Sequence, residues 1–319
     1  MDVLLGLDTS CYTTSAAAVD MAGEVVAFSR LLLPVESGQR GLRQSEAVFA
    51  HVRQFQDVMK TLNEQMPENA SIVGVCASAT PRDEEGSYMP VFRVGAGYGQ
   101  ALADTLRVPF YTTSHQQGHI AAGRIGTEPL GDRFVALHIS GGTTEMVIWE
   151  QGRVEIIGGS MDLHAGQMVD RIGVEMGLPF PAGPELEKLA NQWDGPTEAL
   201  FAASMEQGDC FCHLSGAETK ALRFIRGGTY PREQIAAEVY DLLARSISRM
   251  LDAGCKKYGA KQALVVGGVA SSQLLRKLTR QRLQKNRSKI QLIFGQSQYS
   301  ADNAAGVAWL GLQQYLKNK

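Results

Sequence analysis

The chain has 319 residues, of which 44% are hydrophobic and 20% are charged, an ordinary globular mixture that excludes a wholly disordered protein. With 31 basic and 33 acidic residues the formal net charge is −2, so binding to nucleic acid or to an anionic membrane would need a local patch. The five cysteines form no CxxC pair, which is typical of free thiols in a reducing compartment. No basic leader and no apolar run of the ~18 residues that a membrane span needs are present, so we expect a cytoplasmic protein without membrane contact.

Two segments of the chain resemble each other. Residues 3–8 are an apolar run that leads into a hydroxyl-rich turn over residues 9–15, and residues 134–139 lead in the same way into a turn over residues 140–144. A second apolar run and a glycine turn follow in both cases, which predicts strand, turn, strand, turn and third strand twice. The recurrence indicates two lobes of similar build.

Helices and strands are expected to alternate through the rest of the chain, because apolar residues spaced by three and four give way to short apolar runs. The expected helices cover residues 48–66, 98–106, 164–177, 184–192, 231–258, 271–284 and 304–316, and the expected strands 72–76, 108–111, 263–266 and 291–294. This alternation predicts an α/β protein, with a first lobe of residues 1–126 and a second lobe of residues 127–301.

One segment stands out by its charge. Residues 276–289 hold seven lysines and arginines and no acidic residue. We interpret this segment as the solvated face of a helix, and contact with nucleic acid is the alternative.

Three turns have the composition of phosphate-binding loops. They are residues 9–15, residues 140–144 and the pair Gly267 and Gly268, where small residues expose backbone N–H groups between buried strands. Each turn alone is weak evidence, but turns of this kind on two lobes favour a nucleotide held between them. Neither the Walker pattern nor the GxGxxG dinucleotide pattern occurs at a strand-to-helix junction.

His115 and His119 are the clearest metal-binding signal. Four residues apart on a helix, the two imidazoles lie on one face and can bind one ion. Gln116 occupies the position of the general base in the HExxH motif, so hydrolysis by the route of the zinc proteases is disfavoured. The third ligand is not determined by this pattern.

Eight short motifs match one family in the same order along nearly the whole chain. Residues 5–11 (LGLDTSC) resemble the family's opening GIETSCDET, residues 114–119 (SHQQGH) its HxEGH, residues 135–144 (VALHISGGTT) its VSGGHT, and residues 168–170 (MVD) its FDK. Residues 181–184 (PAGP) resemble its PGGP, residues 213–216 (HLSG) its FSGLK, residues 267–269 (GGV) its GGV, and residues 301–303 (ADN) its TDN. By these motifs the chain resembles the TsaD family, the threonylcarbamoyl transferases of tRNA.

The resemblance implies a two-lobe fold like that of actin, sugar kinases and Hsp70 (the ASKHA class), with a nucleotide cleft between the lobes. The C-terminal helix, residues 302–317, would pack back on the first lobe. His115, His119 and Asp302 would hold one divalent ion, Fe(II) or Zn(II), since two imidazoles and a carboxylate suit both.

The resemblance also implies the substrate-binding residues. Ser140, Gly141, Gly142 and Thr143 would line the loop that holds ATP or threonylcarbamoyl-AMP. Asp170 would bind the ribose, Gly183 would approach the nucleotide closely, and Gly267, Gly268 and Ser272 would complete its site. For Asp8, the candidate catalytic residue, two roles stay open: it orients a metal-bound water, or it caps the turn that follows it.

The chain departs from the family at several positions. Tyr12 and Thr13 replace an Asp-Glu pair, Gln117 replaces an acid, Thr143 a histidine and Ser272 an asparagine. These changes are typical of a divergent paralogue. The main hypothesis is threonylcarbamoyl transfer to the adenosine beside the anticodon of tRNA, and the alternatives are a regulatory partner subunit or carbamoyl transfer to another acceptor.

The partners implied by the resemblance are TsaB-like, TsaE-like or TsaD-like subunits, a second copy of the chain, and tRNA. The helix over residues 44–66 is the expected docking face, because family members dimerise through such helices.

Other reactive side chains have simpler interpretations. His51, His138 and His164 are expected to be packing or surface residues, and Cys11 a small buried side chain rather than a nucleophile. Without the resemblance, Asp302 and Asn303 would be interpreted as the N-cap of the last helix.

Overall fold

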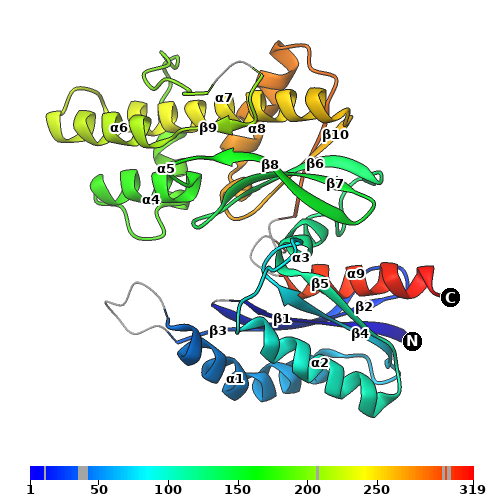
Figure 1. The fold of residues 1–319 in the computed structure, drawn as a ribbon. Coiled ribbons are helices and arrows are strands. Elements are labelled where there is room, and N and C mark those ends of the chain that lie inside the picture. Colours follow the sequence, from blue (N-terminus) through cyan, green and yellow to red (C-terminus); the bar gives the residue numbers. More distant parts are fainter. Residues whose placement is uncertain (11, 35–41, 206–207, 297–298, 300–302) are drawn as a thin grey trace. The chain divides into compact units, whose positions relative to one another are not determined.

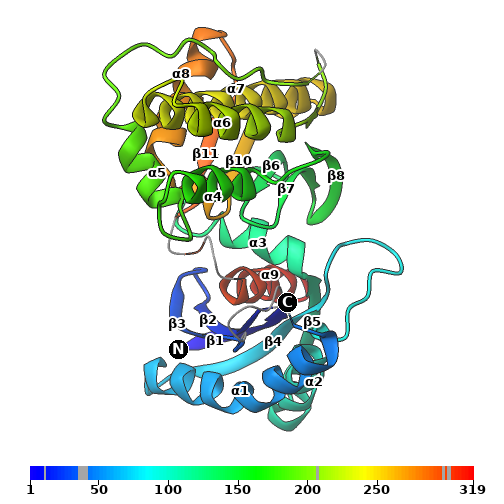
Figure 2. The same ribbon diagram turned by 90° about the vertical axis from the view of Figure 1, so that its left-hand side faces the viewer.

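The computed structural model describes residues 1–10, 12–34, 42–205, 208–296, 299 and 303–319. The chain divides into two compact units, one of Met1–Gly126 with Ala301–Lys319 and one of Thr127–Ser300. Figure 1 and Figure 2 show that each unit is a sheet covered by helices. No helix within the described residues is long and apolar enough to cross a membrane.

The first unit has a five-stranded sheet in the order β3-β2-β1-β4-β5. Strands β1, β2 and β3 are antiparallel neighbours, whereas β4 pairs parallel with both β1 and β5. The strands are β1 (Asp2–Ser10), β2 (Thr13–Asp20), β3 (Val25–Leu32), β4 (Ser71–Thr80) and β5 (Phe110–Ser114), and the helices are α1 (Gln44–Gln65), α2 (Phe92–Leu106), α3 (His115–Ala122) and α9 (Ala304–Lys317).

Strand β1 shows how both faces of this sheet are buried. Val3, Leu5 and Leu7 join a core with α1, while Leu4 packs with residues of α9 on the opposite face. The period of two along a strand therefore sends odd-numbered side chains towards α1 and α2, and even-numbered ones towards α9. Figure 1 shows α1 and α2 on one side of the sheet and α9 on the other. Asp8 is even-numbered and faces the α9 side.

The second unit has a six-stranded sheet in the order β11-β10-β6-β7-β8-β9. Its strands are β6 (Arg133–Ile139), β7 (Thr144–Glu150), β8 (Arg153–Ser160), β9 (Phe211–Cys212), β10 (Gln262–Val266) and β11 (Gln291–Phe294). Its helices are α4 (Ala165–Glu175), α5 (Gly183–Ala190), α6 (Ser215–Gly227), α7 (Arg232–Tyr258) and α8 (Gln273–Lys285), with a 3-10 turn η1 (Val269–Ser271) before α8. The long helix α7 is buried over most of its length and carries much of the core.

The two sheets share one topology. An antiparallel meander is followed by two parallel strands in both, as β3-β2-β1-β4-β5 and as β8-β7-β6-β10-β11. Each meander is one of the two similar sequence segments, so the predicted repeat is confirmed at the level of strand order. Strand β9 is an addition at the edge of the second sheet.

Most of the expected elements are present, with shifted ends. Helix α2 begins at Phe92 rather than at residue 98, because its glycine-rich first turns conceal the apolar period. Gly95 is needed there, since a Cβ would lie 2.9 Å from Thr9 Oγ1. Helix α6 and strand β9 were not predicted from the sequence.

Candidate functional site

The helix that carries the histidine pair begins with a capping box. Ser114 is the N-cap of α3 and its Oγ accepts a hydrogen bond from Gln117 N at 3.1 Å. Gln117 Oε1 accepts in return from Ser114 N at 2.7 Å and from Thr113 Oγ at 2.8 Å. Glutamate and glutamine both serve at this position of a capping box. The replacement of the family's acid by Gln117 therefore preserves the start of the histidine helix.

Helices α3 and α9 cross at two glycines. A Cβ on Gly306 would clash with the carbonyl oxygen of Gly118, and a Cβ on Gly118 would lie 2.6 Å from Asn303 Oδ1. The absence of both side chains lets the helices approach closely, and this brings the start of α9 next to the histidines. The crossing is the tertiary contact that shapes this site.

The two imidazoles point towards the same space. His115 Nε2 and His119 Nε2 are 3.1 Å apart, and their ring centroids are separated by 4.5 Å. His115 Nδ1 lies 3.1 Å from Asp8 Oδ1 and 2.7 Å from Asn303 Nδ2. Without a metal, Nδ1 can accept from Asn303 while Nε2–H donates to His119. With Nδ1 protonated and donating to Asp8, both Nε2 lone pairs are available to one ion, the usual carboxylate–histidine arrangement at metal sites.

Asp8 is a buried carboxylate, only 1% exposed, and its Oδ1 faces three polar side chains. Its Oδ1 accepts from Ser78 Oγ and from Asn303 Nδ2, the latter at 3.0 Å. Burial alone would raise the pKa of Asp8, but the charge and hydrogen bond of His115, with the hydrogen bonds from Ser78 and Asn303, hold this pKa below its ordinary value. Asp8 thus lies behind His115 and orients its ring.

These residues line a cavity of about 280 Å³ in the first unit. The lining residues are Asp8, Ser10, Tyr12, Thr13, Ser15, Pro81, Met89, Phe92, His115, His119 and Asn303. No group of three imidazoles, thiols or carboxylates that could hold a metal occurs among the described residues, and Asp302 lies outside them. The two imidazoles fit a divalent ion as two of its ligands, because their Nε2 atoms are 3.1 Å apart, and Asp8 would hold His115 from behind.

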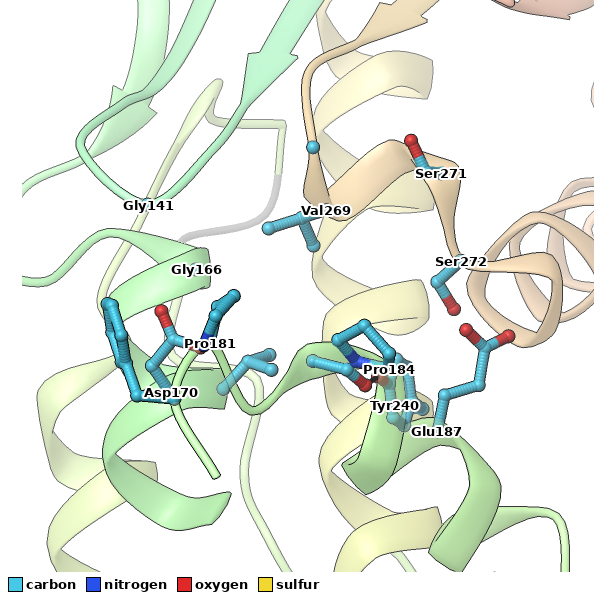
Figure 3. Close-up of a pocket in the computed structure, with 14 residues that line it drawn as sticks. Gly141, Gly166, Asp170, Pro181, Pro184, Glu187, Tyr240, Val269, Ser271 and Ser272 are labelled. Carbon is cyan, nitrogen blue, oxygen red and sulfur yellow. Dashed lines mark hydrogen bonds between the residues drawn. The ribbon is translucent and has the colours of Figure 1, made fainter. Parts of the chain in front are cut away.

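A second cavity, of about 550 Å³, lies in the second unit where the turn after β10, helix α5 and the turn after β6 meet. Figure 3 shows Asp170 and Pro181 on one side of it and Val269, Ser271 and Ser272 on the other. Its lining residues are Gly141, Gly166, Val169, Asp170, Phe180, Pro181, Gly183, Pro184, Glu187, Tyr240, Gly268, Val269, Ser271 and Ser272.

Two glycines, Gly166 in the lining and Gly267 beneath it, make this cavity possible. A Cβ on Gly166 would lie 2.5 Å from Ser140 O, and Gly267, with φ +101°, lies so close to β6 that a Cβ would clash with Ile139 O. Both glycines bring turns into backbone contact. The N–H groups of Gly141 and Gly142 face no hydrogen-bond acceptor among the described residues, and both residues are exposed. Such amides are typical binding groups for phosphate.

Five of the predicted nucleotide-binding residues line the cavity, namely Gly141, Asp170, Gly183, Gly268 and Ser272. The other four lie outside the lining. Ser140 N donates to Thr143 O at 2.8 Å, which closes the turn that contains Gly142, and Gly267 packs beneath β6. Ser140, Thr143 and Gly267 therefore frame the site rather than line it, while Gly142 lies outside the lining with its amide facing no acceptor among the described residues.

Two of the lining side chains also support the turns around them. Asp170 Oδ1 accepts from Ala182 N at 2.8 Å, which fixes the turn before α5. Ser272 is the N-cap of α8, and its Oγ accepts from Leu275 N at 3.1 Å. Serine is a good N-cap, so the change from the family's asparagine keeps this function.

Nine of the 14 lining residues were not predicted from the sequence, and Phe180, Glu187 and Tyr240 are the three with the largest side chains at the site or polar contacts there. Phe180 is 76% exposed, Glu187 Oε1 accepts from Leu274 N at 2.7 Å, and Tyr240 OH donates to Gly183 O at 3.0 Å. Burial, with the charges of Glu187 and Asp170, raises the pKa of Tyr240. In the sequence, only the position of Phe180 next to the PAGP motif pointed to a place in the site. Tyr240 lies in the middle of an apolar helix, so no sequence pattern distinguished it from a core residue.

The remaining candidates behave mainly as packing residues. His51 is fully buried, with Nδ1 2.8 Å from Thr14 Oγ1, and His164 is the N-cap residue of α4. The side chain of Asn303 makes no capping bond to α9 and faces Asp8 instead, while Cys11 and Asp302 lie outside the described residues.

Comparisons with known proteins agree with the motifs. The family model described as "TsaD: tRNA N6-adenosine threonylcarbamoyltransferase" matches residues 36–309. A protein of Geobacillus kaustophilus with the name tRNA N6-adenosine threonylcarbamoyltransferase is 30% identical over 99% of this chain and 92% of its own length. A protein of Thiobacillus denitrificans with the same name is 28% identical over 98% and 91%.

Solved structures support the fold class. HypF of T. kodakarensis superposes with a TM-score of 0.63 at 14% identity, over 99% of this chain and 48% of that one. A glucokinase of the ROK family from Streptomyces griseus gives 0.55 at 14% identity, over 98% and 99%. At this identity the likeness concerns the fold alone, and it confirms the expected actin-like ASKHA class.

Proposed function

Because the chain belongs to the TsaD family of tRNA N6-adenosine threonylcarbamoyltransferases, we propose that it transfers the threonylcarbamoyl group of threonylcarbamoyl-AMP to the adenosine beside the anticodon of tRNA. The observation that carries the proposal is the match over nearly the full length of relatives with that name. The family is metal-dependent and uses nucleotides. The cavity beside the histidine pair and the cavity of the second unit support a site of each kind.

The reaction is an acyl transfer. The N6 amine of adenosine attacks the carbamoyl carbon, a C–N bond forms, the C–O bond to the phosphate breaks, AMP leaves, and N6 loses a proton. The cavity of the second unit suits the AMP part. Its exposed Gly141 amide would bind phosphate, Asp170 would bind the ribose hydroxyls, and Phe180 and Val269 offer apolar surface to the base.

The histidine pair of the first unit would hold the divalent ion, Fe(II) or Zn(II), with Asp302 as the third ligand. When bound, such an ion stabilises negative charge on phosphate and acyl oxygens. Asp8 would then be a positioning residue, because its Oδ1 binds the ring nitrogen of His115 that faces away from His119. This interpretation replaces the two roles that the sequence left open for Asp8.

The departures from the family pattern are compatible with activity. Gln117 and Ser272 retain capping roles in the structure. Tyr12 and Thr13 line the cavity beside the histidines, and Tyr12 is 50% exposed there.

Partner subunits are part of the proposal. Helix α1 exposes Phe49 (63%) and Val52 (44%) to solvent, beside a groove of about 400 Å³ that Pro34, Arg53 and Asp57 help to line. We expect a TsaB-like subunit to dock on this face. Size-exclusion chromatography with and without such a subunit tests it, since a chain that elutes as a monomer in both runs contradicts docking.

A tRNA substrate implies a cytoplasmic location.

The test is reconstitution. The protein is incubated with threonine, bicarbonate, ATP, an enzyme that makes threonylcarbamoyl-AMP, the candidate partner subunits and unmodified tRNA, and the nucleosides are analysed by mass spectrometry. We expect threonylcarbamoyladenosine with the native chain and with His213→Ala, an exposed histidine remote in sequence from the pair, and none with His119→Ala. The proposal fails if the Geobacillus relative forms the product under these conditions and this chain does not.

A further inference from the structure

Positive charge is concentrated in one part of the second unit. Residues 253–301 contain ten lysines and arginines and no acidic residue, leaving 21 basic and 33 acidic residues, a formal charge of −12, for the rest of the chain. A segment of charge +10 in a chain of charge −2 is a strong local departure. It spans the end of α7, strands β10 and β11, and helix α8.

Some of these cations have structural roles. Arg276 Nε donates to Ala270 O at 2.6 Å and its NH2 to Gly295 O at 2.7 Å. These bonds hold the turn beside the cavity of the second unit. Arg282 pairs with the buried Asp241, and the Arg280 guanidinium lies 5.0 Å from the centre of the Phe294 ring. These contacts account for the part of the charge that packs against the unit.

The others form an exposed stripe. Lys277, Lys285 and Lys289 are exposed, and the structure shows no ion pair or hydrogen bond for any of them among the described residues. Lys277 and Lys285 are eight residues apart on α8, two steps of four residues through the exposed Gln281, so they lie on the solvent side of the helix. Exposed Gln281 and Gln284 lie between them, and no carboxylate interrupts the row.

The stripe continues where the parallel strands begin. Lys289 precedes β11 and Lys261 precedes β10. Gln291 N donates to Lys261 O at 3.0 Å, so the two lysines lie at the end of the sheet where these two parallel strands start. Ser288 Oγ donates to Asp252 Oδ1 at 2.7 Å, which joins this end of the sheet to the end of α7. Glu128 also reaches the start of β11, where its Oε2 accepts from Gln291 Nε2 at 2.8 Å.

The stripe also leads to the cavity. Helix α8 starts at Gln273, next to Ser271 and Ser272 of the cavity lining, and ends at Lys285. Thirteen residues of helix extend over about 20 Å at 1.5 Å per residue. In Figure 2 the helix is drawn in orange, as are β10 and β11. A polyanion that follows α8 would thus have one end near the cavity.

We propose that the exposed basic stripe of α8 and the strand starts beside it, formed by Lys277, Lys285, Lys289 and Lys261, binds the phosphate backbone of the acceptor RNA. The inference rests on the proposed function, which requires an RNA acceptor near the cavity. Basic side chains without partners supply sequence-independent affinity by releasing counterions from phosphates. The stripe therefore orients the RNA and does not select the base.

The test measures binding of an unmodified tRNA transcript at several salt concentrations. The variant with Lys277→Gln, Lys285→Gln and Lys289→Gln is compared with a control that has Arg30→Gln, Arg153→Gln and Lys317→Gln, three exposed cations on β3, β8 and α9. Both variants change the net charge equally. At about 0.1 M salt we expect at least tenfold weaker binding for the stripe variant and less than twofold for the control. The slope of log affinity against log salt should fall by about 2, since each contact contributes ~0.7–0.9.

Each other outcome overturns the inference. If the stripe variant binds tRNA like the native chain while the native chain modifies tRNA, the stripe is not the RNA surface and the proposed function stands. If the native chain neither binds nor modifies tRNA, both fail. Equal weakening by the two variants indicates a general charge effect, and loss of binding only to phosphatidylcholine vesicles containing phosphatidylserine indicates a membrane surface instead.

Discussion

The two cavities of this protein are built by opposite means. In the first unit, side chains make the site, since the partly exposed His115 and His119 form a hydrogen-bonded cluster with the buried Asp8 and Asn303. In the second unit the backbone makes it, because glycine turns pack against each other and present amides and small surfaces. A side-chain site depends on which groups are present. A backbone site depends on which groups are absent.

The two sites share one requirement, which is a glycine contact beneath them. Gly306 lets α9 approach α3, and Gly267 lets the turn after β10 approach β6. The first contact positions side chains and the second positions the backbone itself. Adding one methyl group at each glycine should therefore distinguish the two modes.

The largest effect is expected from Gly306→Ala. Its Cβ would clash with the backbone of Gly118 and force α3 away from α9. We expect the free energy of unfolding to fall by about 3 kcal/mol, and bound metal to be lost. Chemical denaturation and metal analysis measure both. Gly97→Ala is the control, because nothing lies within 4 Å of that Cβ on α2, and it should stabilise the protein by up to about 1 kcal/mol. Equal stability of the two variants would contradict the role of the crossing.

Gly267→Ala should act on the second site alone. Residue 267 has φ +101°, and its added Cβ would clash with Ile139 O. The substitution should therefore lower the free energy of unfolding by about 2 kcal/mol and weaken ATP binding. Gly268→Ala has open space and a negative φ, so its stability should change by less than about 0.5 kcal/mol. Calorimetry with ATP and denaturation of both variants test this. Metal content should be unchanged in each, and a parallel loss of metal would show that the sites are not independent.

His119→Ala should lower the affinity for Fe(II) or Zn(II) at least tenfold, because one of the two facing imidazoles is removed. The melting temperature in the absence of metal should change little, since the imidazole is not part of an apolar core. His213→Ala, at an exposed histidine beside Asp162, should keep full metal binding. Full occupancy in His119→Ala would exclude this metal site.

The smallest effect concerns pH. Burial lowers the pKa of His51 from its ordinary value of 6.5, with only partial compensation from the Ser10 backbone and from Asp8. The unfolded chain then binds a proton below about pH 6.5 that the folded chain resists, so stability is present above this pH and is lost as the pH falls below it. One such group contributes at most about 1.4 kcal/mol per pH unit. His51→Gln should reduce the dependence of the free energy of unfolding on pH between pH 7 and pH 5. An unchanged pH dependence in this variant would contradict the role of His51.

The histidine site was partly predictable. The spacing of four placed both imidazoles on one helix face, and the serine three residues before Gln117 marks the start of that helix. The environment of His115 was not predictable, because Asn303 lies 188 residues away and reaches it only through the crossing of α3 and α9.

The sequence by itself determined the strands and helices with a clear apolar period, the repeated meander, the turns that hold glycine, and the family motifs. Those features depend on residues close together in the chain. Only the tertiary structure decided that Asp8 lies behind His115, that Ser140 and Gly267 support the cavity rather than line it, and that Tyr240 and Glu187 belong to its wall. Such roles depend on which faces of distant elements meet. That is fixed by the packing of helices on the sheets and leaves no periodic signal in the local sequence.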